Sequence, residues 1–593
     1  MSFRAPVGDM AFTLKHAAGF KQALAEGLGD DLTEDLVDAI LEEAGRFATD
    51  VISPLNRHGD SHGAVLKDGA VTMPPGWKQA YQAWAAAGWN ALAGPVEWGG
   101  QGLPHALNAV CFEMWNAASM AFGLGPLLTI GAADALAAHG SDALKRTYLP
   151  KLVSGEWMGT MQLTEPQSGS DLSGLRTRAE RAGDGSYRIR GQKIFITYGE
   201  HDLTENIVHF VLARLPDAPA GTRGLSLFLV PKVVLDSAGR LAGRNDARCH
   251  SLEHKLGIHA SPTCTMVYGD EGGATGFLVG EENRGLACMF TMMNNARLGV
   301  GLQGVAIAER ATQLALAYAR ERRQGGGGAA MRPIIEHPDV KRMLLTMRSL
   351  TKAARVICYK TAVAIDRSQR NTDEARRRAA HERASLLTPV AKAFSTDIGN
   401  EVASLGVQVH GGLGYIEETG AAQLFRDARI TPIYEGTNGI QAIDLVTRKL
   451  PLAGGNTVRA FVDELRATIA ALGASNAPDL GATRVRLAEA VDSLERATTW
   501  LLAELGARPQ AALAGATPYL RLLAVAAGGC ALAEEAMAAC RVETTAGNAA
   551  HRDAAITVAR FFADHVATTG VSLERAVVEG SDVVNAAEPA LSA

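Results

Sequence analysis

The pattern of hydrophobic and polar positions divides the chain into helical and strand-rich stretches. Residues 32–48 place apolar side chains three or four positions apart, which is the spacing of a helix with one buried face. Residues 107–120 and 132–153 continue in the same style. We therefore expect a mostly helical N-terminal domain over residues 1–158.

Between residues 159 and 280 the pattern changes to short runs rich in β-branched and aromatic residues. Clusters of Gly, Asp, Pro and Asn separate these runs, and such clusters commonly bound strands. The clearest runs are residues 187–196, 207–215, 225–234 and 264–268. This stretch is predicted to be a small all-β domain.

Long helical periodicity returns over residues 281–450, with a break at the glycines 325–328. A further helical block, residues 451–593, follows a linker-like sequence at 451–456. We find no internal repeat of 20–50 residues. The expected fold class is thus α+β multidomain, in the order helices, small β domain, helices and an appended helical domain.

Composition narrows the class of protein. With 593 residues, the chain is long enough for about three to five domains. A hydrophobic content of 47% and a charged content of 20% are typical of a globular enzyme and exclude a disordered or fibrous chain. The net charge of −5 gives no basic field for nucleic acid, and the appended block is itself acidic, with 11 Arg, no Lys and 16 Asp or Glu.

Cysteines and apolar runs indicate the compartment. The seven cysteines show no CxxC and no paired spacing, and the 15 histidines lack zinc-ligand spacing, so we expect buried reduced thiols and no metal site. The first residues carry no signal or transit pattern. Apolar runs such as 121–133 and 522–533 are shorter than the roughly 18 residues of a membrane span. A cytoplasmic protein without a membrane span is therefore expected.

Three segments carry the chemistry. They are residues 161–171 (MQLTEPQSGSD), 193–199 (KIFITYG), and 408–415 (QVHGGLGY) with 433–441 (IYEGTNGIQ). In these segments the chain resembles the acyl-CoA dehydrogenase family, FAD flavoproteins with a helix–β–helix fold. The resemblance covers about residues 35–450, and the appended block resembles the longer subgroup that includes 3-methylmercaptopropionyl-CoA dehydrogenases.

The resemblance implies four units. They are an N-terminal helical domain over residues 1–158, a central β-barrel over 159–280, a C-terminal four-helix bundle over 281–450 and the appended helical domain over 451–593. The bundle would carry the catalytic base.

The resemblance also implies which residues contact FAD. A flavin ring needs flat apolar faces and a few hydrogen-bonding groups at its rim. The matching residues are Gln162, Leu163, Thr164, Phe195, Ile196 and Thr197. Family members often carry Trp where this chain has Phe195, a smaller ring without an N–H donor. Ser170 matches a serine that binds the cofactor pyrophosphate and lies near the substrate.

A second set of residues matches positions that reach the FAD of a neighbouring subunit. Glycines there let the backbone approach a phosphate closely. This set comprises Arg322, Gln408, Gly411 and Gly412. In place of the aromatic residue that often follows the arginine, this chain has Gly325. His337 stands where a histidine near the flavin phosphates is common, although a capping histidine fits the position equally well. The family assembly implied is a homodimer or a dimer of dimers.

Glu435 matches the glutamate that removes the substrate α-proton. A carboxyl with an ordinary pKa near ~4.3 is a weak base, but burial against an acyl chain would raise its pKa. In the same segment, Gly436 matches a substrate contact and Thr437 a cofactor contact.

Some family branches place the base directly before an arginine that matches Arg297. Here that position is Ala296, which cannot take a proton, so Glu435 is favoured as the base. Asn294 and Arg297 match residues near the CoA moiety, with helix-surface polarity as the alternative role.

Two motifs are rejected as ligand sites. Residues 299–304 (GVGLQG) satisfy the dinucleotide-binding pattern, but no strand precedes them, and the residues about 20 positions on are mainly basic (Arg320, Arg322 and Arg323). They are predicted to be small residues in a tightly packed helix. The arginines 376–378 and Arg383 share their helix with acidic residues and are predicted to form a solvated, salt-bridged face.

The implied activity is oxidation of an acyl-CoA to the trans-2-enoyl-CoA, with electrons passed to an electron-transfer flavoprotein. A short thioether-containing substrate such as 3-methylthiopropionyl-CoA and a straight medium or long acyl chain both remain open. The alternatives are an acyl-CoA oxidase of the same fold and a DNA-binding flavoprotein relative. The acidic appended block disfavours the second, because DNA binding needs a basic surface.

Overall fold

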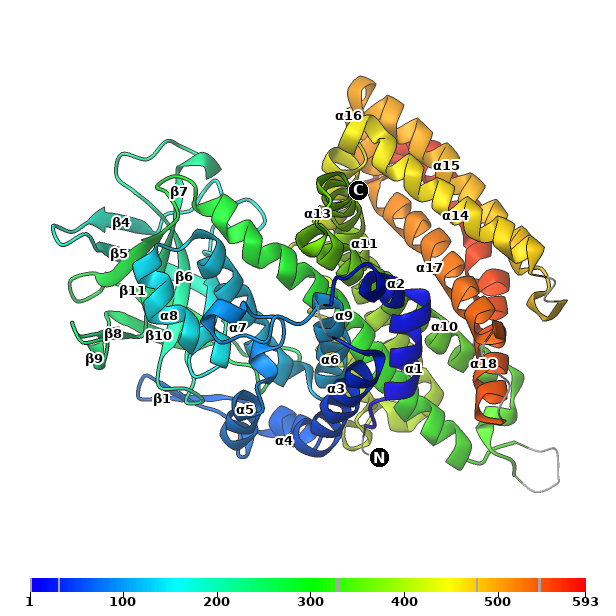
Figure 1. Cartoon of the computed structure of the whole chain (residues 1–593), viewed down its shortest axis with the longest axis horizontal. Helices are drawn as coiled ribbons and strands as arrows, with labels where there is room; N and C mark the ends of the chain where they lie inside the picture. The colour runs from blue at the N-terminus through cyan, green and yellow to red at the C-terminus, as the bar shows by residue number, and fades with distance from the viewer. Residues whose placement is uncertain (1–2, 30–31, 326–330, 476–477, 542–545, 593) are drawn as a thin grey trace.

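The computed structural model describes residues 3–29, 32–325, 331–475, 478–541 and 546–592. The β domain lies at one end of the molecule and the appended helices lie at the other (Figure 1). The N-terminal helices and the long helices of the bundle fill the space between them. This multidomain arrangement confirms the predicted fold class.

The N-terminal region is mostly helical, as predicted. Its helices are α1 (Val7–Phe12), α2 (Phe20–Ala25), α3 (Glu34–Phe47), α4 (Leu55–His62), α5 (Trp77–Ala86), α6 (His105–Ala118), α7 (Met120–His139) and α8 (Asp142–Ser154). The Thr33 side chain caps α3 by accepting a hydrogen bond from the Leu36 backbone N–H. A small hairpin of β1 (Val65–Lys67) and β2 (Ala70–Thr72) was not predicted, because three-residue strands are too short to show an alternating pattern.

The β domain contains ten strands. They are β3 (Met158–Gln162), β4 (Arg178–Arg181), β5 (Tyr187–Thr197), β6 (Ile207–Arg214), β7 (Leu225–Pro231), β8 (Val233–Leu235), β9 (Leu241–Arg244), β10 (Ala247–Leu252), β11 (Thr263–Tyr268) and β12 (Ala274–Val279). Pairings run from β4 to β5, β12, β7 and β6, and β6 returns to β4. The strands therefore close into a ring, which confirms the predicted barrel. β11 and β10 extend the sheet from β5, and β3 joins β6 in parallel.

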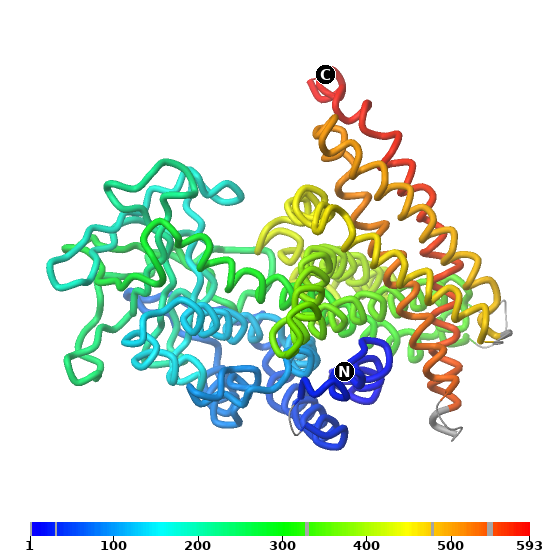
Figure 2. The backbone as a smooth tube through the Cα atoms, turned by 45° about the horizontal axis from the view of Figure 1, so that its top comes forward, coloured from blue at the N-terminus to red at the C-terminus, as the bar shows by residue number. Residues whose placement is uncertain are grey.

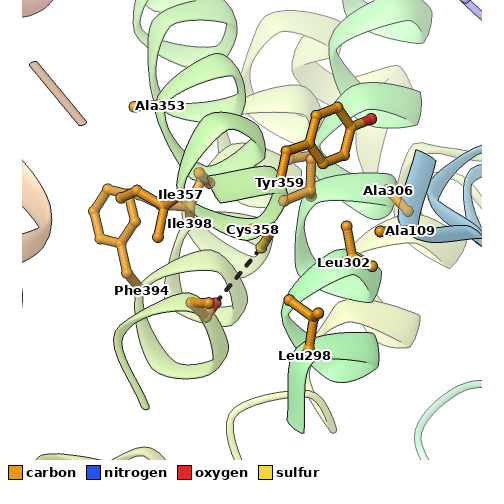
Figure 3. Close-up of a cluster of buried hydrophobic side chains, with 14 of the residues drawn as sticks. Ala109, Leu298, Leu302, Ala306, Ala353, Ile357, Cys358, Tyr359, Phe394 and Ile398 are labelled. Carbon is orange, nitrogen blue, oxygen red and sulfur yellow. Dashed lines mark hydrogen bonds between the residues drawn. The ribbon is translucent and has the colours of Figure 1, made fainter. Parts of the chain in front are cut away.

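Three long helices form the body of the bundle: α9 (Gly285–Glu321), α10 (Pro338–Arg370) and α11 (Glu374–His410). The shorter α12 (Ala421–Ala428) and α13 (Asn438–Asp444) complete it. Leu302 of α9, Ile357 of α10 and Phe394 of α11 belong to one buried core (Figure 3).

Two glycines let α9 and α11 approach each other closely. A Cβ atom on Gly301 would lie 2.7 Å from the Ala391 carbonyl oxygen, and one on Gly304 only 2.2 Å from that of Ser395. The rejected dinucleotide pattern is thus a helix-packing surface, as predicted. The residue numbers of both helices rise together along this contact, so the two helices run parallel.

The appended domain consists of helices throughout. They are α14 (Asn456–Ala474), α15 (Thr483–Ala507), α16 (Pro509–Ala514), α17 (Ala516–Arg541), α18 (Ala546–His565), α19 (Gly570–Val578), α20 (Ser581–Asn585) and α21 (Glu588–Leu591). Figure 2 shows them against the bundle, on the side away from the β domain. α17 packs on α10 so closely that a Cβ on Gly528 would lie 2.9 Å from that of Ala353. Arg383 of α11 forms an ion pair with Glu464 of α14, which confirms that this arginine is salt-bridged.

Two sequence-based expectations need correction. The apolar runs extend within α7 and α17 into helices that are long and apolar enough to cross a membrane by length and composition. Of their most apolar windows, 78% and 94% of residues are buried inside the protein, which is typical of core helices. Six cysteines are buried as expected, but Cys540 is exposed near the end of α17. Within the described residues, no group of three His, Cys, Asp or Glu could hold a metal ion.

Candidate active site

The loop between α12 and α13 holds Glu435 in an unusual conformation. Glu435 has a φ of 56° and Gly436 a φ of 84°, so both lie in the left-handed region. For a residue with a side chain this conformation costs about 1–3 kcal/mol, and such strain concentrates at functional sites. The side chain of Glu435 is half-buried. The backbone therefore marks this residue independently of any sequence motif.

The surroundings of Glu435 change its proton affinity. Burial raises the pKa of Glu435 to about 7, while the positive charges of Arg297 and Lys392 oppose that rise. Neither cation forms an ion pair with Glu435 in the part of the chain that the structure describes. A carboxyl with a pKa near neutrality, and with no ion-pair partner, is suited to accept a proton from a substrate.

Lys392, which the sequence analysis missed, holds this loop from α11. Its Nζ donates to the Gly436 carbonyl oxygen at 2.9 Å and to Asn438 Oδ1 at 2.8 Å. The Lys392 side chain is completely buried. Burial lowers the pKa of Lys392 to about 7, against the opposing charges of Glu435 and Asp397. A lysine between two alanines on an otherwise apolar helix face was the available sequence signal.

Further hydrogen bonds fix both sides of the loop. Tyr434 donates its hydroxyl to Gln303 Oε1 of α9 at 2.5 Å. The Thr437 hydroxyl oxygen accepts from the Ile440 backbone N–H and so caps α13. The hydroxyl proton of Thr437 remains available for a ligand, because the capping bond uses only the oxygen.

Asn294 and Arg297 share a cavity, which is consistent with their predicted position near the CoA moiety. The cavity measures about 590 Å³ and lies between α7, α9 and the adjoining ends of α10 and α11. Arg297 Nε is buried and has no hydrogen-bond partner among the residues that the structure describes. A buried guanidinium nitrogen without a partner, beside a cavity, is suited to bind a polar or anionic group. Ala296 is buried and, as expected, offers no alternative base.

The motif segments 161–171 and 193–199 lie side by side in the β domain. The Ile194 backbone N–H donates to the Thr164 carbonyl oxygen at 2.9 Å. Glu165 accepts from Lys193 Nζ at 2.8 Å, and both side chains are buried. Although burial opposes it, the Lys193 charge lowers the pKa of Glu165 to about 2. Glu165 is therefore a fixed anchor for the exposed loop that carries Ser170.

The side chains of two predicted cofactor contacts are buried within the β domain. Ile196 is buried inside the β domain, and Gln162 is tied into its interior by a 2.6 Å hydrogen bond from the Tyr268 hydroxyl. β5 is irregular at this point: its register against β11 shifts between Cys264 and Met266, and Lys193 and Ile196, three residues apart, are both buried. Phe195 between them has a φ of 59° and is 59% exposed, and Thr197 is half-buried.

Arg322, Gln408, Gly411 and Gly412 lie far from Arg297 within one chain. The rings of Tyr318 and His410 stack with centroids 4.4 Å apart, so the C-terminal ends of α9 and α11 lie together. Arg297 and Arg322 are 25 residues apart on α9, which at 1.5 Å per residue is about 38 Å. The structure thus separates the predicted residues into two groups within one chain.

The backbone in the distant group is open. A Cβ on Gly411 or Gly412 would meet nothing within 4 Å. His337 Nε2 donates a 2.9 Å hydrogen bond to the Gln324 carbonyl oxygen, because a carbonyl oxygen can only accept. A Cβ on Gly325 would lie 2.9 Å from that ring, which explains the glycine at this position.

Comparison with known proteins gives four family matches in order along the chain. Residues 34–156, 160–270 and 283–450 match the N-terminal, middle and C-terminal domains of acyl-CoA dehydrogenase. Residues 461–588 match the family described as acetyl-CoA dehydrogenase C-terminal like.

Individual relatives are similar over most of their length. A 3-methylmercaptopropionyl-CoA dehydrogenase from Ruegeria pomeroyi is 50% identical over 95% of this chain and 96% of its own. A butyryl-CoA dehydrogenase from Syntrophomonas wolfei is 34% identical, with 77% of each chain covered. The crystal structure of Caenorhabditis elegans ACDH-11 in complex with C11-CoA has a TM-score of 0.78 at 21% identity, covering 97% of this chain and 95% of that chain.

Proposed function

Because this chain belongs to the acyl-CoA dehydrogenase family, we propose that it converts an acyl-CoA to the trans-2-enoyl-CoA with FAD as cofactor. The observation that carries the proposal is Glu435, a strained and half-buried carboxyl whose pKa lies near 7. Glu435 removes the α-proton in this proposal. An α-C–H group is a weak acid, so its removal requires both a matched base and stabilisation of the thioester oxygen.

The loop offers donors for that oxygen. The backbone N–H groups of Glu435 and Gly436 have no acceptor within the described part of the chain. Oriented N–H groups of this kind stabilise developing negative charge without reorganisation. Gly436 is the proposed substrate contact in this loop, and Asn294 and Arg297 are the proposed contacts for the CoA moiety along their cavity. Ser170, exposed on the loop after β3, is the proposed substrate contact from the β domain.

The residues of the β domain fit a flavin. Phe195 presents an exposed apolar ring, and Thr197 in the same segment and Thr164 on the adjoining segment supply polar groups. Leu163 lies beside them, whereas Gln162 and Ile196 could take part only through their backbone. When bound, FAD accepts the β-hydrogen as a hydride. Thr437, with its free hydroxyl proton, is the proposed contact from the Glu435 loop.

The second group fits an FAD held by another subunit. The open backbone at Gly411 and Gly412, with Arg322 and Gln408 nearby, suits a phosphate group. One ring nitrogen of His337 donates to the Gln324 carbonyl oxygen, and the other could bind a ligand. Arg322 and Arg297 lie about 38 Å apart along α9, and this separation supports a homo-oligomer in which each FAD is shared between two copies.

The similarity to a 3-methylmercaptopropionyl-CoA dehydrogenase supports a short, thioether-containing acyl group as substrate. We propose an electron-transfer flavoprotein as the electron acceptor. Two further points stay predictions. One is the cytoplasmic location, and the other is the division of the chain into units 1–158, 159–280, 281–450 and 451–593.

A panel of acyl-CoAs tests the proposal. The purified holoenzyme is mixed without oxygen with butyryl-, octanoyl-, palmitoyl- and 3-methylthiopropionyl-CoA, and bleaching of the oxidised flavin band is recorded. We expect bleaching, fastest with the short acyl groups. Bleaching by none of them would refute the proposal. Turnover with a dye acceptor but without oxygen consumption separates a dehydrogenase from an oxidase of the same fold.

A further inference from the structure

We propose that Lys392 is a positioning residue of the reaction: its ammonium fixes the peptide between Gly436 and Thr437 and stabilises the negative charge of Glu435. The inference rests on the proposed role of Glu435 as the base. It adds a second element, α11, to the control of that base.

The geometric part follows from the planar trans peptide, in which C=O and N–H point in opposite directions. Lys392 holds the Gly436 oxygen at 2.9 Å, so the N–H of Thr437 points away from Lys392. Gln441 Nε2 donates to the backbone carbonyl oxygen of Glu435 at 3.3 Å. The N–H of Gly436, in the same peptide, therefore points away from the Gln441 side chain. Two side chains therefore decide where the free N–H groups of the loop point.

Lys392 is itself held firmly. Its second acceptor, Asn438 Oδ1, belongs to an amide whose Nδ2 donates to Asp397 Oδ1 at 2.7 Å and to the Ala393 oxygen at 3.1 Å. Asp397 and Ala393 lie on α11 beside Lys392. A buried ammonium is costly unless its donors are satisfied, and this clamp supplies two acceptors. The arrangement ties the Glu435 loop to the rigid helix.

The electrostatic part depends on every charge that faces these two groups. Arg297 from α9 and Lys392 from α11 both favour the ionised form of Glu435. Lys392 in turn faces Glu435, Asp397 and Arg297. Asp444 lies near Arg297, and its negative charge partly compensates the positive charge of the guanidinium. Glu435 and Lys392 therefore titrate as a coupled pair, and removal of the lysine charge should raise the pKa of Glu435.

The Lys392→Met variant tests the inference. An opposite charge nearby changes a carboxyl pKa by about 1 unit or more, so the rising limb of the pH–rate profile should move to higher pH by ~1 unit. Because the pKa of Lys392 is itself about 7, the wild-type lysine carries part of its charge at pH 7, and flavin bleaching by the variant should be up to about fivefold slower there, beyond any loss that is equal at all pH values. This extra loss should vanish at pH 9.

Three further variants complete the experiment. Lys392→Arg keeps a positive charge at every pH of the assay, so the rising limb of its pH–rate profile should not move to higher pH. Lys392→Gln is uncharged but keeps an N–H donor, and it replaces Lys392→Met if that protein does not fold with FAD. Lys341→Met, at an exposed site on α10, is the matched control and should change nothing.

The results separate a positioning role from a structural one. If Lys392 only supported the fold, its loss would slow bleaching equally at pH 7 and pH 9, and that result would overturn the inference. If Glu435→Gln still bleached rapidly, the proposed base itself would be wrong. Glu435→Gln could be inactive while Lys392→Met keeps both the wild-type rate and the wild-type rising limb of the pH–rate profile. In that case only the inference about Lys392 would fail.

Discussion

Replacement of Glu435 by Gln should inactivate the enzyme and at the same time make the protein more stable. Gln has nearly the same volume and resembles a protonated carboxyl, but it cannot take a proton. Burial raises the pKa of Glu435 from an ordinary 4.5 to about 7. A difference of 2.5 pH units corresponds to about 3 kcal/mol, which is the cost of keeping Glu435 ionised in the folded protein.

The sign of the pH dependence follows from linkage. The folded protein binds the Glu435 proton more tightly than the unfolded chain, so stability falls as pH rises from about 4.5 to about 7. Below pH 4.5 Glu435 is protonated in both states and Glu435→Gln should have no effect. Above pH 7 the variant should be more stable than the wild-type protein by up to about 3 kcal/mol.

The activity of the wild-type enzyme should follow the same titration. With a pKa of about 7, roughly one eleventh of Glu435 is ionised at pH 6 and ten elevenths at pH 8, so bleaching should be about tenfold faster at pH 8. Glu435→Gln should be slower by about 10²–10⁴-fold, the usual contribution of a positioned general base.

Anaerobic stopped-flow absorbance gives the bleaching rates, and thermal unfolding at pH 4.5 and pH 8 gives the stability difference. Glu42→Gln, at an exposed site on α3, is the control for loss of one surface carboxyl. Rapid bleaching by Glu435→Gln would refute the assignment of the base. An inactive variant that was no more stable at pH 8 would refute the argument that burial sets the pKa of Glu435.

Three other predictions concern the scaffold. A chain that ends at Leu450 should aggregate or lose its assembly in size-exclusion chromatography, and a soluble, flavin-loaded product of unchanged size would contradict this. Gly304→Ala should lower stability by about 1–3 kcal/mol in thermal unfolding, because its Cβ would overlap α11, whereas Gly8→Ala meets no atom within 4 Å and serves as control. Glu165→Gln should cost about 3–5 kcal/mol at pH 7, because it leaves Lys193 buried without its partner, and unchanged stability would refute the anchoring role. Since the pKa of Glu165 is lowered to about 2, its contribution should be lost as pH falls from 4.5 toward 2.

The sequence was sufficient where a local pattern decides the structure. The apolar spacing of residues 32–48 predicted α3, and residues 451–593 were predicted to be helical, as α14 and the helices that follow it are. Small residues at 299–304 predicted the close approach of α9 to a neighbour, although the sequence could not show that the neighbour is α11. The sequence could not show that the side chains of Gln162 and Ile196 are buried, because β3 is buried at every position and the end of β5 is irregular, so neither shows an alternating pattern.

Contacts between distant parts of the chain could not be predicted. Arg355 of α10 pairs with Glu113 of α6, which lies 242 residues earlier in the sequence, and both are completely buried. Lys352, one turn before it, reaches Asp9 near the N-terminus and Glu535 of α17. No local spacing brings these residues together, because only the folded arrangement makes them neighbours.

Other long-range contacts explain how the strained backbone conformation of Glu435 is maintained. α12, which precedes the loop, is held by the β domain, where the Ile258 backbone N–H donates to Asp427 Oδ1 at 2.5 Å. Lys392 of α11 holds the middle of the loop. α13, which follows the loop, packs on α17 of the appended domain. Since left-handed strain persists only where the surroundings over-determine it, three separate units of the fold contribute to the conformation of one carboxylate. Through α17, the appended domain thus supports the helix that follows the loop.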